Sequence, residues 1–534
     1  MYKRKGGPAA CAQLQPEPQA GQVAYINRGV PAKSYAVFNF KGGAGKTTLA
    51  INLAARLANF KRNRGARVLV IDGDSQCDLT SFHTPAHSVL HTEEQQAAAA
   101  TEACKQTMAH AESGSSASEE DEAETEEEPG IECFPVHDGA DTHCVPMEDL
   151  IAERKGGLDR IFEPYFRRDP SFADVEEQIS AVVSQARNKV SIADIAPHAV
   201  APGASREARA AALGSAFIEC DKSKYHGRLW VLRGSPRLSI DRDAGMGAAA
   251  EQPCKKYVKL GIFSCLLQRL SSHFDFIIVD LNPSSAALNK VMAMSCDYIL
   301  PPCFAEGFSS NSVHGMLTSV LPEWFAWQAK VNDQQNEMME MRDDEEDIHE
   351  DFLFPNVHPH VLPFICTNFD TQIEVKGDKP KGRIKNRINP HNSGFVNTMR
   401  QFIYAYVAEF INSEDKRGTA QKKKRVARAL LPNRPPDGKA QYVITLLPHV
   451  HGAMSLCHEQ ARPLVECTRK SLVESGHVPK KKPKTMSMSE WEREFNEEVK
   501  TAKEQYGSLA TWLFWLRKHP PKKIKCKDYL EMVD

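Results

Sequence analysis

A glycine-rich stretch near the start of the chain has the residue types needed to hold a phosphate. It reads KGGAGKTT and comprises Lys41, Gly42, Gly43, Ala44, Gly45, Lys46, Thr47 and Thr48. Glycines let the backbone crowd an anion, so that successive N–H groups and a helix N-terminus point at it. In such loops the lysine contacts the β- and γ-phosphates and the following threonine hydroxyl is a ligand of Mg²⁺. The usual pattern begins with a further glycine, and here Phe40 takes that position.

The segments on either side of the loop are those that a phosphate site requires. The apolar run SYAVFNF (34–40) predicts a buried parallel strand. Apolar residues then recur at helical spacing over 47–60, and RVLVIDGD (67–74) predicts a second buried strand. The three segments together form a βαβ unit of the expected length.

A third buried strand, DFIIVDLNP (275–283), contains Asp280. An aspartate at the end of a buried strand places an anionic oxygen on a rigid element, as Mg²⁺ binding beside phosphates needs. The alternative for Asp280 is a strand-end cap. For Asp74, at the end of the second strand, the alternative to a role in chemistry is a helix cap or turn residue.

Further apolar runs predict the rest of the sheet. Strands are expected over 228–236, 296–303, 360–369 and 442–449, with a helix over 259–274. Strands alternating with helices predict an α/β fold: a doubly wound, mostly parallel sheet with helices on both faces. The acidic segment 331–351 and the basic segment 376–392 are predicted to be loops.

Composition divides the chain into four parts. We expect a disordered leader over 1–33, an acidic disordered insertion over 81–149, an α/β domain with the phosphate loop over 34–80 and 150–470, and a basic linker with a C-terminal helix over 471–534. The formal net charge is only −2, but acidic and basic residues are segregated along the chain. Neither a secretory signal nor an 18-residue apolar run is evident, so we expect a cytoplasmic protein, with nucleoid or nuclear association as variants.

These motifs resemble the deviant Walker A loop and its partners in the ParA/MinD family of P-loop ATPases. VLVIDGDSQ resembles the second motif of that family, with Ser75 where proline is usual, and FDFIIVDLNPSSAAL resembles Walker B, with Asn282 replacing another proline. The resemblance implies a SIMIBI-type P-loop NTPase that binds ATP and Mg²⁺ and forms an ATP-sandwiched homodimer. It implies that Lys41 reaches the partner's phosphates, that Asp74 places the attacking water and that Asp72 lies near the metal. Asn368 and Pro448 fall where family members approach adenine.

The resemblance also implies a switchable partner, and several partners fit the sequence. The Lys/Arg runs 376–387 and 421–428 suit non-specific DNA, whose phosphates require only charge and reach; a solvated basic loop is the alternative. A MinD-like membrane switch is the rival interpretation, because 506–527 combines apolar aromatics with a basic tail. We favour a helix that instead docks these apolar residues on the domain. A non-hydrolysing, ATP-dependent scaffold is a third possibility, and the cargo or activating protein is not identified.

Overall fold

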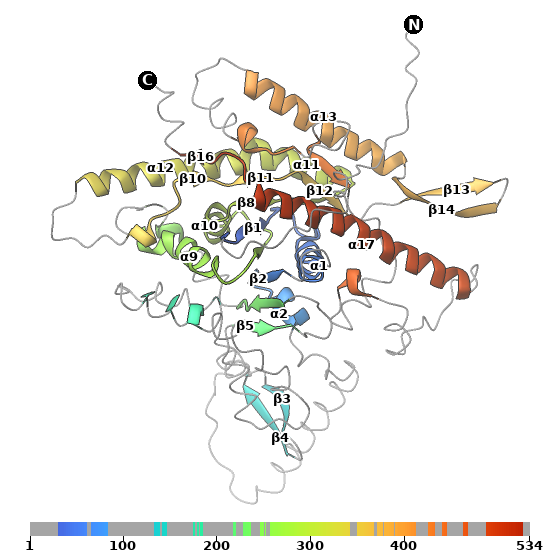
Figure 1. Ribbon diagram of the computed structural model, residues 1–534, viewed down its shortest axis with the longest axis horizontal. Helices are drawn as coiled ribbons and strands as arrows, with labels where there is room; N and C mark the ends of the chain where they lie inside the picture. Colours follow the sequence, from blue (N-terminus) through green and yellow to red (C-terminus); the bar gives the residue numbers. More distant parts are fainter. Residues whose placement is uncertain are drawn as a thin grey trace, which may run out of the picture. The chain divides into compact units, whose positions relative to one another are not determined.

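The computed structural model in Figure 1 describes the parts of the chain that surround the predicted loop. The described residues are 30–60, 66–83, 133–138, 141–146, 158, 175–176, 179–180, 182–184, 217–220, 228–235, 246–249, 251, 257–341, 350–367, 371–376, 379–388, 390–412, 426–432, 441–445, 463–467 and 488–526. They fall into two compact units, one formed by 1–83, 157–193 and 216–534 and the other by 84–156 and 194–215.

The first unit is built on a seven-stranded sheet, which confirms the predicted α/β fold. Its strand order is β11-β8-β1-β7-β2-β6-β5, and all neighbours are parallel except β5 and β6. The strands are β1 (Lys33–Val37), β2 (Arg67–Gly73), β5 (Phe217–Glu219), β6 (Arg228–Leu232), β7 (Phe276–Leu281), β8 (Tyr298–Leu300) and β11 (His360–Val361). The strand carrying Asp280 therefore lies between the strand that enters the loop and the strand that ends in the other aspartates.

Side chains that alternate along each strand enter separate cores on the two faces of the sheet. Tyr35 and Val37 face one core, whereas Ala36 and Phe38 face the other. Helices α1 (Lys46–Ala58) and α17 (Met488–Lys518) cover the first face and pack against each other (Figure 1). Helices α9 (Tyr257–Leu270), α10 (Ala287–Ser295) and α12 (Leu321–Glu340) contribute to the second core. Because both faces are covered, the strands are apolar throughout, as the sequence indicated.

Smaller sheets adjoin this framework. The apolar run 296–303 divides into β8 and β9 (Pro302–Phe304), and β9 pairs with β12 (Phe364–Thr367), which pairs with β15 (Val443–Thr445). Strands β10 (Val357–His358) and β16 (Ile524–Lys525) pair antiparallel. The short helices are α2 (Asp78–His83), α11 (Gly307–Gly315), the π-helix η6 (Met316–Val320), and the 3₁₀ turns η7 (Glu350–Phe352) and η8 (Leu464–Glu466).

The predicted docking of the C-terminal helix on the domain is confirmed. Leu509 and Leu513 of α17 are fully buried, and Phe514 packs edge-on against Phe276 of β7. Trp515 is the exposed residue of this apolar group, at 46%. Most of the apolar side chains that suggested a membrane surface are thus packed in the core of the protein. In the described part of the chain, no helix combines the length and hydrophobicity needed to cross a bilayer.

Two segments predicted to be loops are regular elements instead. Helix α12 continues to Glu340 through the first part of the acidic segment, because buried amides at helical spacing bond to the following loop. The basic segment forms an antiparallel hairpin of β13 (Thr371–Lys376) and β14 (Lys379–Ile388), which ends just before α13 (Pro390–Asn412). Cross-strand pairing with two irregularities in register orders this backbone despite its charge.

The predicted disordered insertion also contains a regular element. Strands β3 (Cys133–Asp138) and β4 (Asp141–Pro146) pair antiparallel across a two-residue connection. Asp138 pairs with Asp141 beside this connection, whose first residue is Gly139, and glycine at the first position of a two-residue loop favours a hairpin. Residues 84–132 of the insertion, and residues 1–29 of the predicted leader, lie outside the described residues.

Candidate functional site

The predicted phosphate loop joins β1 to α1 and ends in a backbone conformation that glycine favours. Gly43 and Gly45 have φ angles of 69° and 78°, and Gly45 is the N-cap of α1. A Cβ atom on Gly45 would also lie 3.3 Å from Oγ1 of Thr367. A Cβ on Gly42 meets nothing within 4 Å, Ala44 is buried, and the Thr48 carbonyl accepts a hydrogen bond from Asn52 Nδ2 at 2.9 Å.

Lys46 is buried at the start of α1, and its ammonium group bends back over the loop. Its Nζ donates to the carbonyl oxygen of Lys41 at 3.2 Å. Burial lowers the pKa of Lys46, and the charges of Asp280 and Asp74 oppose that change. A phosphate entering the loop would offer this cation a stronger, charged acceptor than a carbonyl.

Asp280 lies beside Thr47 at the centre of the sheet edge. Its carboxylate is buried and neither oxygen has a hydrogen-bond partner among the described residues, although the nearby Thr47 hydroxyl stabilises the charged form. Burial raises the pKa of Asp280 well above its ordinary value, and Asp72 raises it further. An orphaned carboxylate beside a hydroxyl fits Mg²⁺, which takes one or two protein oxygens and completes its shell with phosphate and water. No group of three or more His, Cys, Asp or Glu residues in the described ranges could hold a metal by itself.

Asp72 pairs in register with Asp280 on the neighbouring strand, and its oxygens have partners within the protein. Its Oδ2 accepts from both the amide and the hydroxyl of Thr80, and Oδ1 accepts from the Asp74 amide at 3.3 Å. The Thr80 hydroxyl in turn accepts from the Gly234 amide at 2.9 Å. Burial raises the pKa of Asp72 to about 7. The residue therefore joins α2 and the end of β6 to β2, and its predicted place near the metal stays a prediction.

Asp74 is buried at the start of the turn that follows β2. Its Oδ1 accepts from the Gln76 amide at 3.0 Å, and its carbonyl accepts from the Cys77 amide at 3.1 Å. Cys77 is the positive-φ non-glycine residue of the described chain, at 55°. The alternative role as a turn residue is thus realised, and it holds the carboxylate close enough to Lys46 for the two charges to interact.

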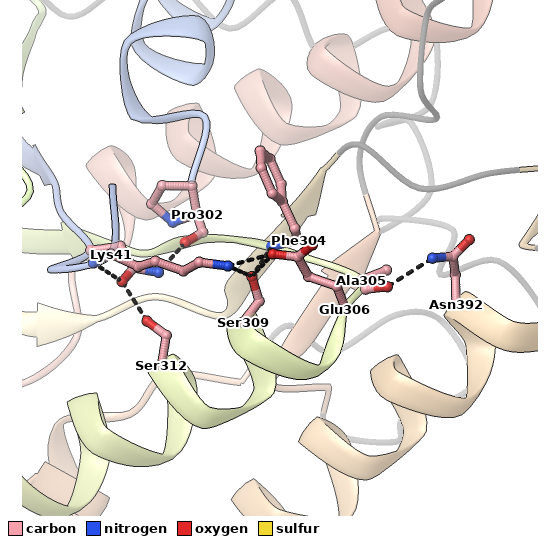
Figure 2. Close-up of polar contacts among 9 residues, drawn as sticks. Lys41, Pro302, Phe304, Ala305, Glu306, Ser309, Ser312 and Asn392 are labelled. Atoms are coloured by element: carbon pink, nitrogen blue, oxygen red, sulfur yellow. Dashed lines mark hydrogen bonds and ion pairs between the residues drawn. The ribbon is translucent and has the colours of Figure 1, made fainter. Parts of the chain in front are cut away.

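Lys41 is held within its own chain by a polar network around the start of α11 (Figure 2). Its Nζ forms an ion pair with Glu306, the residue that precedes α11, and lies 3.5 Å from Ser309 Oγ and 5.6 Å from the centre of the Phe308 ring. The side chains of Lys41 and Glu306 are 27% and 45% exposed, and Phe308 is 77% exposed. The lysine therefore sits at the surface, where another charged group could reach it.

The residues before Lys41 are fixed to the same helix. Asn39 is fully buried; its Nδ2 donates to the Pro302 carbonyl at 2.7 Å, and its Oδ1 accepts from the Lys41 amide at 3.0 Å and from Ser312 Oγ at 2.7 Å. Phe40 packs toward α11, where a Cβ added to Gly315 would lie 3.2 Å from its ring. Phe40, which stands in place of the usual first glycine, thus packs against α11.

Sequence reasoning missed several members of the site. Thr80, Glu306, Ser309 and Asn39 had no assigned role, although Glu306 and Ser309 stand three residues apart where a strand gives way to a helix. The predicted adenine neighbours Asn368 and Pro448 lie outside the described residues. So do most of the run 421–428 and all side chains of the run 376–387.

Residues 32–125 match the AAA_31 family model, described as an AAA domain. Two Pseudomonas putida sequences, described as uncharacterized proteins, are each 57% identical over 63 residues, which is 11% of this chain and 22% of the relative. The aligned region thus spans under a quarter of these relatives.

Three solved structures that resemble this chain are only distantly related to it in sequence. A structure of pNOB8 ParA bound to nonspecific DNA is 13% identical, with a TM-score of 0.37, and covers 92% of this chain and 100% of that one. A Cyanothece McdA–ATP complex is 13% identical, with a TM-score of 0.34 and coverages of 88% and 98%. A Corynebacterium diphtheriae protein is 17% identical, with a TM-score of 0.33 and coverages of 62% and 82%. Scores this low do not bear on function. The family match includes the loop, so this part of the chain is a P-loop domain, and its motifs are similar to those of the ParA/MinD type.

Proposed function

We propose that this chain binds Mg-ATP in the loop between β1 and α1 and hydrolyses it as a dimer with a second copy. One observation carries the proposal: the buried, unpartnered Asp280 carboxylate stands beside Thr47, next to the loop that holds Lys46. A buried anion without a hydrogen-bond partner is costly unless a cation completes it. Mg²⁺ would neutralise phosphate charge, with Thr47 and Asp280 as its protein-side groups, Asp280 directly or through water.

The remaining roles follow from where the side chains stand. Lys46 would exchange the Lys41 carbonyl for phosphate oxygens, and the loop amides would complete the anion site. Asp74, fixed by its turn, would orient the attacking water. Lys41 would leave Glu306 and contact the phosphates bound by the second copy, supplying positive charge where it develops in the transition state.

Size measurement with ATP, with ADP and without nucleotide tests this proposal. We expect dimers with ATP only, and we expect Lys41→Ala to bind ATP as a monomer that turns over at least about tenfold more slowly. Asp74→Ala should accumulate as the ATP-bound dimer. Wild-type turnover by Lys41→Ala would contradict the role in a partner's site. ATP-dependent dimers without turnover would favour the scaffold alternative.

We further propose that the basic hairpin β13–β14 binds DNA through phosphate contacts. The run 376–387 lies almost wholly in this two-stranded ribbon, which joins α13 through a single residue. Asn392 in the first turn of α13 donates to the Ala305 carbonyl at 2.7 Å, next to the Glu306 that holds Lys41 (Figure 2). Duplex binding in ATP should weaken steeply between two salt concentrations, and replacing the run's lysines should reduce that salt dependence. Binding that is equal with ATP, ADP and no nucleotide would contradict an ATP-controlled interaction.

A further inference from the structure

The two positions that depart from the family pattern contact each other. Asn282 Nδ2 donates a hydrogen bond to Ser75 Oγ at 3.3 Å, and both residues are half-buried. Ser75 follows β2 and Asn282 follows β7; these strands are parallel neighbours with Asp72 opposite Asp280. The two loops therefore leave the sheet at the same level, and this bond crosses between them.

Each end of this bridge is anchored in its own loop. Asn289, almost fully buried in α10, donates from Nδ2 to the Asn282 carbonyl and to the Ser284 carbonyl and hydroxyl, each at 2.9 Å. The Ser284 amide also donates to the Asn282 carbonyl at 2.9 Å. The backbone around Asn282 is therefore fixed to α10, and its side chain has a defined position from which to reach Ser75.

On the other side, Ser75 lies inside the turn that positions Asp74. That turn is closed by bonds from the Gln76 amide to Asp74 Oδ1 and from the Cys77 amide to the Asp74 carbonyl. Because Ser75 is covalently joined to Asp74 and Gln76 within this closed turn, a displacement of the Ser75 backbone shifts the residues on either side of it. A contact at Ser75 therefore bears directly on where the Asp74 carboxylate stands.

We propose that Asn282 is a positioning residue that sets the Asp74 carboxylate through Ser75. The proposal rests on the proposed function, in which Asp74 orients the attacking water. Proline at either position would fix only its own loop, since it restricts φ and has no side-chain donor. The Asn282–Ser75 bond instead makes the two loops move together, so the Asp280 side of the site and the Asp74 side adjust as one unit.

A double-mutant cycle on full-length protein tests this coupling. Ser75→Ala and Asn282→Ala should each lower kcat by about three- to tenfold, because a misplaced group costs rate, while the dissociation constant for ATP and the melting temperature stay close to wild type. The double variant should be no slower than the slower single one, since both changes remove the same bond. Ser75→Thr keeps the hydroxyl and should retain most of the rate.

Ser295→Ala is the matched control. Ser295 is a half-buried serine of α10 whose hydroxyl bonds to the Val291 carbonyl of its own helix, away from both loops. It should leave kcat unchanged. Single variants at the wild-type rate, or losses that multiply in the double variant, would overturn the proposal. If ATP affinity and thermal stability fell together with kcat, the bond would have only a structural role. If the wild-type chain bound ATP without turnover, the proposed hydrolysis itself would be contradicted.

Discussion

Two buried charged groups at the sheet edge are poorly compensated without a ligand. Lys46 has a lowered pKa and a carbonyl acceptor, while Asp280 has a raised pKa and no hydrogen-bond partner in the described chain. Asp72, by contrast, is bonded to Thr80 on the same sheet edge. Phosphate and Mg²⁺ would satisfy the first two groups together, which is why binding at this site should depend steeply on each of them.

Removal of the loop lysine is the most direct test at this scale. Lys46→Ala should weaken ATP binding by about 10- to 100-fold, the usual range for a bond to a charged group. Titration with a fluorescent ATP analogue measures the change. Lys33→Ala is the matched control, because Lys33 pairs with Asp297 at 2.7 Å at the opposite end of β1. If both variants lost the same amount of ATP affinity, the result would contradict ATP binding by the loop lysine.

Asp280→Asn removes the buried charge without changing the size of the side chain. A carboxyl group whose folded pKa is raised binds protons more tightly when folded, so its stabilising effect is present below about pH 4 and is lost as pH rises toward the folded value. Without nucleotide, the melting temperature of the variant should therefore exceed that of wild type increasingly as pH rises from 5 to 8. Mg-ATP should reverse the order by stabilising only wild type. If the difference in melting temperature between variant and wild type stayed constant from pH 5 to 8, the buried charge on Asp280 would be contradicted.

At the scale of elements, apolar runs predicted the strands around the loop. The sequence did not predict which polar side chains are buried or which distant backbone segments pair. β1, β2 and β7 are continuous apolar segments, so hydropathy identified them. The last half of α12 was missed because its buried positions include Asn332 and Gln335, whose amides bond to the loop around Pro355. Hydropathy counts such residues as exposed. The ion pair between Lys41 and Glu306 links residues 265 positions apart, a separation over which local patterns carry no information.

The packing of α17 on α1 gives a prediction for the C-terminal helix. Leu513→Ala should lower the free energy of unfolding by about 2–5 kcal/mol, because Leu513 is fully buried. Trp515→Ala, at a 46% exposed position two residues away, should change it by less than about 1 kcal/mol. Chemical denaturation measures both. If lipid vesicles bound wild-type protein and Trp515→Ala abolished that binding without affecting stability, the membrane alternative would regain support.

At the scale of the whole molecule, Lys41 must break its ion pair with Glu306 before it can contact a second copy. Its ion pair with Glu306 is partly exposed on both sides, and such pairs contribute no more than about 1 kcal/mol. Phosphate oxygens in a water-excluded interface would be much stronger acceptors. The pair is therefore weak enough to exchange, and it orients the lysine at the surface until ATP is bound.

Glu306→Gln isolates that exchange, because it keeps the shape of the side chain and removes its charge. If the ion pair restrains Lys41, the ATP-bound dimer should form at up to about 30-fold lower protein concentration, because each of the two copies loses a restraint of up to about 1 kcal/mol. Sedimentation over a concentration series with ATP measures the shift, and ADP samples should remain monomeric. Glu323→Gln on α12 provides the control: it removes one acidic charge from a helix of the same unit without touching the Lys41 pair. A weaker ATP dimer in Glu306→Gln would show that Glu306 supports the dimer instead of restraining Lys41.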